Sequence, residues 1–137
     1  FMGGVSGNAG LFSTAEDVAK VYQMLVDKGI YNGKRFFSLE TCNLFLTHTS
    51  RISRRGLGFD KPDTKNVDKS PCAEEAPAEV FGHTGFTGTC AWADPKNRLV
   101  FVFISNRIYP RVFDHKKLMS LNIRPRIQQV MYQSLMK

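Results

Sequence analysis

The fold is decided by a stretch in the second half of the chain, which reads Val80-Phe81-Gly82-His83-Thr84-Gly85-Phe86-Thr87-Gly88-Thr89-Cys90-Ala91-Trp92. Apolar residues stand at both ends and glycines bound a polar middle, a pattern that predicts two strands joined by a tight turn. Glycine tolerates the backbone conformations and close approaches that such a turn requires. We therefore expect a hairpin whose turn carries His83 and Thr84, supported by the rest of the chain.

A helix is predicted upstream of this hairpin, over residues 14–28. Ser13 and Glu16 have the spacing of a capping box, in which each side chain satisfies a free backbone N–H at the start of a helix. Gly29 suits the left-handed conformation that ends a helix. Apolar residues recur at helical spacing on one face, which we expect to face the core: Val18, Val21, Tyr22, Leu25 and Val26.

Three further segments precede the hairpin. Ser38 can cap a second helix, whose core-facing residues are expected to be Leu39, Cys42, Phe45 and Leu46. Residues 55–60 hold two glycines beside apolar residues, which predicts a short strand. Residues 61–79 are rich in Pro, Lys, Asp and Glu without periodicity, which predicts a surface loop.

Strand and helix patterns also follow the hairpin. After a turn at residues 94–97, residues 99–104 form a continuous apolar run that predicts a central strand covered on both faces. A C-terminal helix follows, and its core-facing residues are expected to be Ile127, Val130, Met131 and Leu135. The predicted fold class is therefore α+β, with an antiparallel sheet of about three to five strands packed by helices.

Composition narrows the classes of function. The chain has 137 residues, 42% of them hydrophobic, and a formal net charge of +7, which fits one globular domain with a basic surface. The basic residues are scattered without a nucleic-acid motif, so no nucleic-acid partner is expected, although a small anion-binding domain remains a distant alternative. Three cysteines without CxxC spacing predict neither a disulfide framework nor a metal site. No cofactor is expected.

The turn of the hairpin could carry chemistry. It does not match the dinucleotide fingerprint, and a strand follows where a phosphate loop would have a helix, so phosphate binding is excluded. An active-site edge strand fits better, because Gly85 lets a substrate lie close, Thr84 offers a hydroxyl and His83 can donate a hydrogen bond or carry charge beside a carboxylate. The N–H of Phe86 could be one donor of an oxyanion hole. The residues alone fit a plain hairpin with solvated side chains equally well.

Three motifs, in this order, resemble one known family. Residues 10–17 read Gly-Leu-Phe-Ser-Thr-Ala-Glu-Asp, similar to its Gly-Leu-x-Ser-Thr-x-x-Asp segment before a helix. His83-Thr84-Gly85 matches the His variant of its Lys/His-Thr/Ser-Gly triad, and residues 105–110, Ser-Asn-Arg-Ile-Tyr-Pro, resemble its Asn-containing strand end. This family is the serine β-lactamase and penicillin-binding-protein superfamily, in the branch of class C β-lactamases, DD-peptidases and esterases. The resemblance covers nearly the whole chain.

The resemblance also implies that catalytic elements are missing. The family's nucleophile is the Ser of a Ser-x-x-Lys motif far upstream of the triad, and the literal match here, Ser134 to Lys137, lies downstream and is interpreted as a coincidence. The family's Tyr-x-Asn element is absent as well, and the chain begins with Phe1. We therefore interpret residues 1–137 as the C-terminal portion of a single serine hydrolase domain of β-lactamase/transpeptidase-like fold, without the N-terminal part that holds the nucleophile.

The resemblance assigns roles to the residues that remain. The parent protein would attack an amide, lactam or ester carbonyl through an acyl-enzyme, and this portion alone would be inactive. Its catalytic contributions would be His83 and the N–H of Phe86 as an oxyanion donor. The substrate and its carboxylate would be held by residues of two strand ends and the N-terminal loop: Thr84, Gly85, Asn106, Arg107 and Asn8.

The expected partners follow from these roles. They are a small-molecule or peptide substrate with a carboxylate, and the N-terminal half of the same protein. Without that half, the helix and strand faces that it would cover are exposed. Residues 1–137 alone are therefore expected to dimerise or to exchange strands. The resemblance favours a periplasmic, extracellular or envelope-associated location. The alternative function is a non-catalytic module of the penicillin-recognising fold that serves binding or regulation.

Overall fold

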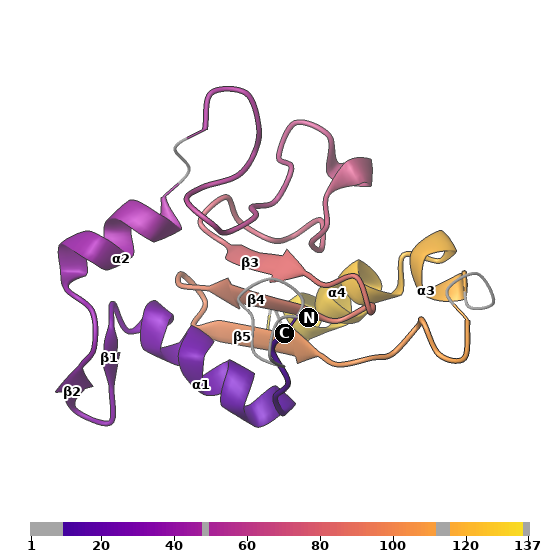
Figure 1. The fold of residues 1–137 in the computed structure, drawn as a ribbon. Helices are drawn as coiled ribbons and strands as arrows, with labels where there is room; N and C mark the ends of the chain where they lie inside the picture. The colour runs from indigo at the N-terminus through magenta and orange to yellow at the C-terminus, as the bar shows by residue number, and fades with distance from the viewer. Residues whose placement is uncertain (1–9, 48–49, 112–115, 136–137) are drawn as a thin grey trace.

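The computed structural model describes residues 10–47, 50–111 and 116–135 (Figure 1). In chain order the elements are α1 (Ala15–Val26), β1 (Ile30–Tyr31), β2 (Lys34–Arg35), α2 (Leu39–Leu46), the 3-10 helix η1 (Val67–Lys69), β3 (Phe81–Thr84), β4 (Cys90–Asp94), β5 (Leu99–Phe103), α3 (Lys117–Ser120) and α4 (Ile123–Leu135). The predicted α+β class is confirmed: helices pack on a three-stranded antiparallel sheet, and β1 and β2 form a separate hairpin. Among the described helices, none is long and apolar enough to cross a membrane.

The hairpin of residues 80–92 supplies the first two strands of the sheet. β3 pairs with β4 from Phe81 opposite Ala93 to Thr84 opposite Cys90, and β4 pairs with β5 on its other side. β4 is therefore central and wholly buried, whereas β5, predicted as the central strand, lies at the edge of the described sheet. The prediction was wrong because an apolar run reports on the layers above and below a strand and not on its neighbours within the sheet.

One face of the sheet packs on α1 and α2. Its buried cluster consists of Leu25, Val26, Cys42, Leu46, Phe81 and Ala93. The Phe81 ring stacks on Tyr22 with centroids 6.0 Å apart, and Phe59 meets it edge-on at 5.3 Å. Leu39 and Phe45 were expected in this core, but both are about half exposed. The prediction failed because the eight-residue α2 buries only two positions, one turn apart.

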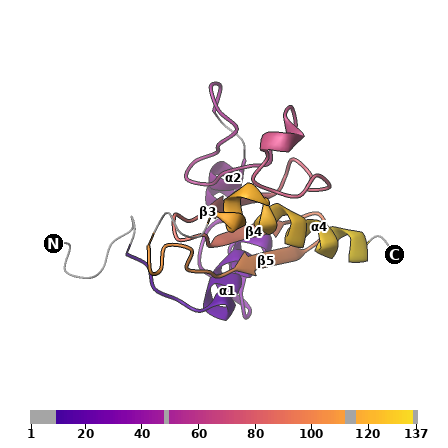
Figure 2. The same cartoon turned by 90° about the vertical axis from the view of Figure 1, so that its right-hand side faces the viewer.

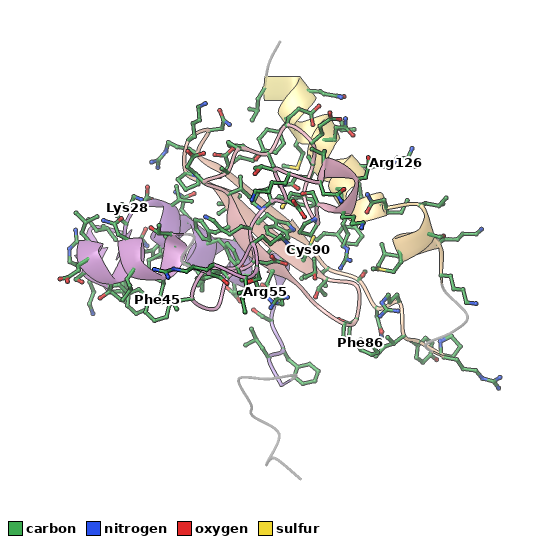
Figure 3. All side chains as sticks on the ribbon, turned by 90° about the horizontal axis from the view of Figure 1, so that it is seen from above. Lys28, Phe45, Arg55, Phe86, Cys90 and Arg126 are labelled. Carbon is green, nitrogen blue, oxygen red and sulfur yellow. The ribbon has the colours of Figure 1, made fainter. Side chains whose placement is uncertain are left out.

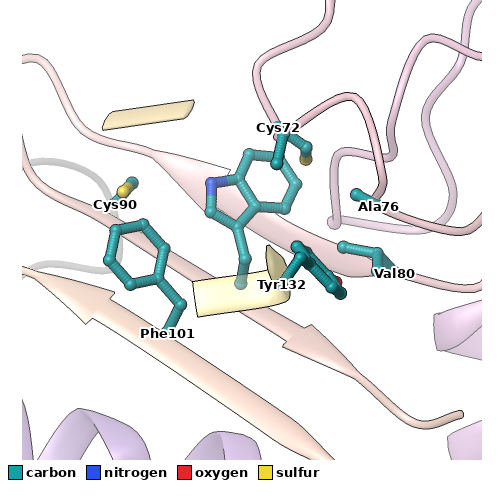
Figure 4. Packing of buried hydrophobic residues seen from close by; sticks show 8 residues of the cluster. Cys72, Ala76, Val80, Cys90, Phe101 and Tyr132 are labelled. Carbon is teal, nitrogen blue, oxygen red and sulfur yellow. The ribbon is translucent and has the colours of Figure 1, made fainter. Parts of the chain in front are cut away.

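The opposite face packs on α4 and on the loop before β3 (Figure 2). Its buried cluster consists of Cys72, Ala73, Ala76, Val80, Cys90, Trp92, Phe101 and Tyr132. Cys90 and Phe101 lie at one end, and Cys72, Ala76 and Val80 at the other (Figure 4). Residues 61–79, predicted as a surface loop, therefore fold partly into the core.

The buried face of α4 differs from the prediction. It consists of residues on successive turns, Arg124, Gln128 and Tyr132. The apolar residues expected there are exposed or only partly buried: Ile127, Val130, Met131 and Leu135. The buried polar groups have partners, because Gln128 Oε1 accepts the N–H of Ala73 at 2.9 Å and the hydroxyl of Tyr132 donates to Asp94 at 2.8 Å. The prediction failed because hydrogen bonds offset the burial of polar groups.

The start of α1 lies one residue later than predicted. Thr14 is the N-cap, and its Oγ1 accepts the N–H of Asp17 at 3.1 Å. Ser13 instead donates to the backbone oxygen of Thr14. The predicted capping box is therefore wrong, because Thr14 and Asp17 have the same spacing and Thr14 takes the cap.

The end of α1 is also earlier than predicted. The N–H of Gly29 donates to the oxygen of Met24 at 2.8 Å, and Lys28, with φ 55°, takes the first left-handed position. Gly29 has φ 85°, and a Cβ there would lie 2.4 Å from the oxygen of Phe37. The glycine is therefore required for a close approach just beyond the helix.

Residues 55–60 form isolated bridge positions at Gly56 and Asp60 rather than the predicted strand. The N–H of Asp60 donates to the oxygen of Gly82 at 2.7 Å, and the N–H of Gly82 donates back at 3.1 Å. A single bridge suffices to place the buried Asp60 beside β3. The arginines that precede it are thereby brought to the same edge as His83.

Candidate active-site strand

The turn between β3 and β4 has a fixed backbone geometry. The N–H of Gly88 donates to the oxygen of Gly85 at 3.0 Å, and the N–H of Gly85 donates to the oxygen of Thr89 at 2.8 Å. Gly88 has φ 98°, and a Cβ there would lie 2.5 Å from atoms of both Ser105 and Leu118. The turn therefore requires glycine at this position and rests on segments that follow β5.

Most of the carbonyl groups of the turn are hydrogen-bonded within the described part of the protein. The oxygen of Thr87 accepts the N–H of Arg107 at 2.9 Å. Nη1 of Arg124 donates to the oxygens of Gly88 and Thr89, at 3.3 and 3.0 Å. The N–H of Phe86, by contrast, has no acceptor in the described part of the chain. The turn thus occupies most of its acceptors and leaves the N–H groups of Phe86 and Thr87 without an acceptor among the described residues.

A cation lies over the side chain of Phe86. The Phe86 side chain is 68% exposed, at the outer end of the turn (Figure 3), and Cζ of Arg107 lies 4.9 Å from the centre of its ring. Arg107 forms no ion pair with the described carboxylates, and its Nε is buried without a hydrogen-bond partner among the described residues. The N–H of Phe86 is therefore a free donor, and the guanidinium of Arg107 beside its ring has no described carboxylate partner.

His83 is held between two groups. Its Nε2 lies 3.2 Å from Nη1 of Arg55, and its Nδ1 lies 2.7 Å from the backbone oxygen of Thr84. A guanidinium only donates and a carbonyl only accepts, so this arrangement makes Nε2 the acceptor and places the proton on Nδ1. In this geometry the ring is neutral, and the positive charge at this edge of β3 belongs to Arg55.

The arginines beside His83 are gathered by Asp60. Arg54 forms a two-pronged ion pair with this buried carboxylate, through Nε and Nη2 at 2.8 Å each. Arg55 lies farther from it, with Nη2 at 3.9 Å. Because one carboxylate faces two guanidinium groups, this edge of the sheet keeps an excess of positive charge.

Thr84 and Gly85 complete the end of β3. Successive residues of a strand point to opposite faces, so His83 shares the face of Phe81 while Thr84 shares the face of Gly82. The Thr84 hydroxyl has no hydrogen-bond partner in the described segments. A Cβ at Gly85 would lie 2.2 Å from Oγ1 of Thr89. A ligand that touches both His83 and Thr84 would therefore lie along the open edge of β3.

Of the two other residues predicted for the site, the structure describes only one. Asn106 is exposed at the end of β5, next to Arg107 in the chain. Asn8 lies outside the described residues. The contacts of Arg55 and Arg124 were not predicted from the sequence. No group of three His, Cys, Asp or Glu side chains that could hold a metal ion occurs among the residues described.

Comparison with known families assigns the chain. A family model described as Beta-lactamase matches residues 2–121. The chain belongs to the beta-lactamase family. The match includes both the triad of β3 and the cap of α1, so the predicted resemblance is confirmed.

Curated relatives agree with this family. A putative D-alanyl-D-alanine carboxypeptidase of Escherichia coli O157:H7 is 38% identical over 117 residues, which is 85% of this chain. A protein named N-acetylmuramyl-L-alanine amidase from Bacillus subtilis is 35% identical over 115 residues, or 82% of the chain. These matches cover 26% and 25% of the two relatives, so this beta-lactamase-family chain spans about a quarter of their length.

Proposed function

We propose that the complete protein is a serine hydrolase that cleaves an amide bond near a substrate carboxylate, and that these residues form its substrate-binding and oxyanion strand. The observation that carries the proposal is the free N–H of Phe86 beside the unpaired guanidinium of Arg107. A donor on the turn and a cation over the Phe86 ring suit a substrate with two anionic oxygens, one on the reacting carbonyl and one on a carboxylate.

In the proposed reaction, a serine from outside residues 1–137 attacks the scissile carbonyl carbon. The carbonyl oxygen becomes a tetrahedral oxyanion and accepts the N–H of Phe86, a donor that is held in place before the reaction. The C–N bond then breaks, the leaving amine takes the proton that the serine hydroxyl gave to a base outside residues 1–137, and an ester remains on the serine. Water hydrolyses this ester and restores the hydroxyl.

In this proposal His83 holds Arg55 at the edge of β3 and does not transfer a proton. Its Nε2 accepts from Arg55 and its Nδ1–H donates to a backbone oxygen, so neither nitrogen is free to carry a proton to the leaving group. The Thr84 hydroxyl and the exposed Asn106 amide are free to contact the substrate. Gly85 leaves room for the Thr89 side chain at the end of β3.

The substrate class follows from the relatives together with the charge of the site. A carboxypeptidase, by its name, removes a residue that ends in a free carboxylate, and an amidase cleaves an amide. Arg107 provides positive charge beside the turn, and Arg55 provides it beside β3. Such a carboxylate would lie near these charges. We therefore propose a peptide or amide with a carboxylate near the scissile bond.

Replacing Arg107 with alanine in the complete protein is expected to raise KM for a peptide with a free C-terminal carboxylate by about tenfold. This corresponds to about 1.4 kcal/mol, near the lower end for a hydrogen bond to a charged group. Steady-state kinetics with the free peptide and with its C-terminal amide measure the effect. The rise in KM should be far smaller for the amide than for the free peptide.

The matched control is Arg98→Ala. Arg98 forms an ion pair with Asp27 at 2.8 Å and does not contact the turn. Its removal should leave both substrates unaffected. An equal rise in KM for the free peptide and its amide in Arg107→Ala would contradict carboxylate binding by Arg107.

The isolated 137-residue chain is expected to be inactive, because the proposal places the nucleophile outside it. A chromogenic β-lactam and a p-nitrophenyl ester are suitable substrates for the test. Turnover well above that of a His83→Ala variant would refute the proposed location of the nucleophile.

The same preparation bears on the proposed partners. β5 has an unpaired edge in the described sheet, and α2 exposes Leu39, Leu44 and Phe45. Such edges and apolar faces pair with other chains when left uncovered. We propose that the N-terminal part of the same protein covers them, and that the isolated chain forms dimers or exchanges strands. Sedimentation of a single monomeric species would argue against this.

A further inference from the structure

Arg124 is buried at the start of α4 although it carries a charge. Its residue is 8% exposed, and no described carboxylate lies within ion-pairing distance of it. Nη1 donates to the oxygens of Gly88 and Thr89, and Nη2 lies 3.3 Å from Sδ of Met119. A buried charge that lacks a carboxylate destabilises a fold compared with an apolar side chain of similar size. Packing alone therefore does not explain an arginine here.

The contacts of Arg124 lie at the closing end of the turn that carries Phe86. The oxygen of Thr89 accepts both the Arg124 guanidinium, at 3.0 Å, and the N–H of Gly85, at 2.8 Å. One carbonyl thus joins the two ends of the turn to α4. Nη1 alone donates to both oxygens while Nη2 lies against Met119, so the planar guanidinium is held by the turn and by α3 together.

We propose that Arg124 is a positioning residue for the oxyanion hole: it fixes the turn so that the N–H of Phe86 points at the reacting carbonyl, and it places a permanent positive charge beneath that turn. This inference rests on the proposed hydrolase function. The charge acts on groups near the turn, because burial raises the pKa of Cys90 to about 11 while the nearby Arg124 opposes that rise. The same charge stabilises negative charge that develops at the oxyanion.

Arg124→Met in the complete protein tests the proposal. Methionine fills similar space without charge or donors. Loss of an oxyanion donor lowers kcat by about a hundredfold to a thousandfold. In Arg124→Met the donor is displaced but still present, so the reduction in kcat should be smaller. We expect a fall of about tenfold. KM should change by less than about twofold, because a donor that acts on the transition state affects kcat. The denaturation midpoint should stay the same or rise.

Two further variants sharpen the kinetic test. Arg126→Met is the matched control, because Arg126 is exposed on the same helix (Figure 3) and should tolerate the change without effect. Arg124→Lys keeps the charge without the planar guanidinium that contacts both the turn and Met119, so its kcat should fall between wild type and Arg124→Met. A kcat for Arg124→Met equal to that of Arg126→Met overturns the proposal. A loss of kcat that only follows a loss of folded protein overturns it as well.

A readout that does not need turnover separates this proposal from the proposed function. The amide resonance of Phe86 in 1H–15N spectra should shift or broaden in Arg124→Met, together with those of Gly88 and Thr89, and should not change in Arg126→Met. An unchanged Phe86 resonance in Arg124→Met overturns positioning, whatever the activity. Wild-type protein without hydrolytic activity would refute the function while this spectrum still decides whether Arg124 orders the turn.

Discussion

Gly82→Ala is expected to lower the free energy of unfolding by about 3 kcal/mol, at the upper end for forcing extra atoms into a packed core. A Cβ at Gly82 would lie 2.1 Å from the backbone oxygen of Ala91 and 2.6 Å from Cε3 of Trp92. Neither can move freely, because both belong to the wholly buried central strand β4. The bridge from Gly82 to Asp60 would shift as well. Chemical denaturation at neutral pH measures the change.

Gly33→Ala is the matched control for this experiment. Gly33 has φ 74°, but no atom lies within 4 Å of the position that its Cβ would take. The cost there should therefore be the backbone cost alone, about 1 kcal/mol. An equal reduction in the free energy of unfolding in the two variants would show that the close approach of β3 to Trp92 does not constrain the fold.

Alkaline pH is expected to reduce the free energy of unfolding by about 3 kcal/mol between pH 8 and pH 11. Burial raises the pKa of Cys90 from 9.0 to about 11 and that of Tyr22 from 10.0 to about 12. Burial also raises the pKa of Cys72 and of Tyr132. The unfolded chain loses these protons first. The stabilisation is therefore complete below pH 9 and is lost as the pH rises toward the folded-state values.

One buried group acts in the opposite direction. Burial lowers the pKa of Lys61, whose Nζ donates to the backbone oxygens of Leu46 and Glu79. Its contribution to stability rises with pH up to 10.5, against the loss from the four acidic groups. Denaturation midpoints at several pH values measure the net effect, and Cys90→Ala should flatten the profile above pH 9. A profile that is level or rises from pH 8 to 11 would contradict the expectation.

Local patterns in the sequence predicted the local structure. The glycines of residues 80–92 identified the hairpin, and Ser38 identified the start of α2 correctly. At α1, two overlapping cap patterns one residue apart, Ser13 and Thr14, could not be separated, because both satisfy the same spacing rule. Patterns of this kind depend on neighbours within a few residues, which a sequence displays directly.

Contacts between distant segments could not be predicted in the same way. The triad of β3 was recognised, but neither the Arg55 contact to His83 nor the Arg124 contact to the turn was, since they join residues 28 and 35 positions apart or more. The buried face of α4 was missed for the same reason. Its polar residues are buried only because partners such as Asp94 come from other elements. Such pairings follow from the assembled fold and not from periodicity.

The contact between Arg124 and the turn also sets an order of events during protein synthesis. The hairpin of β3 and β4 leaves the ribosome before α4 does, and Arg124 follows Gly88 by 36 residues. Chains fold from the N-terminal side as they are made, and contacts between distant segments must wait for the later one. The turn can therefore take its final shape only after α4 has emerged. A nascent chain that stops short of α4 would hold the β3–β4 turn without its contacts to Arg124.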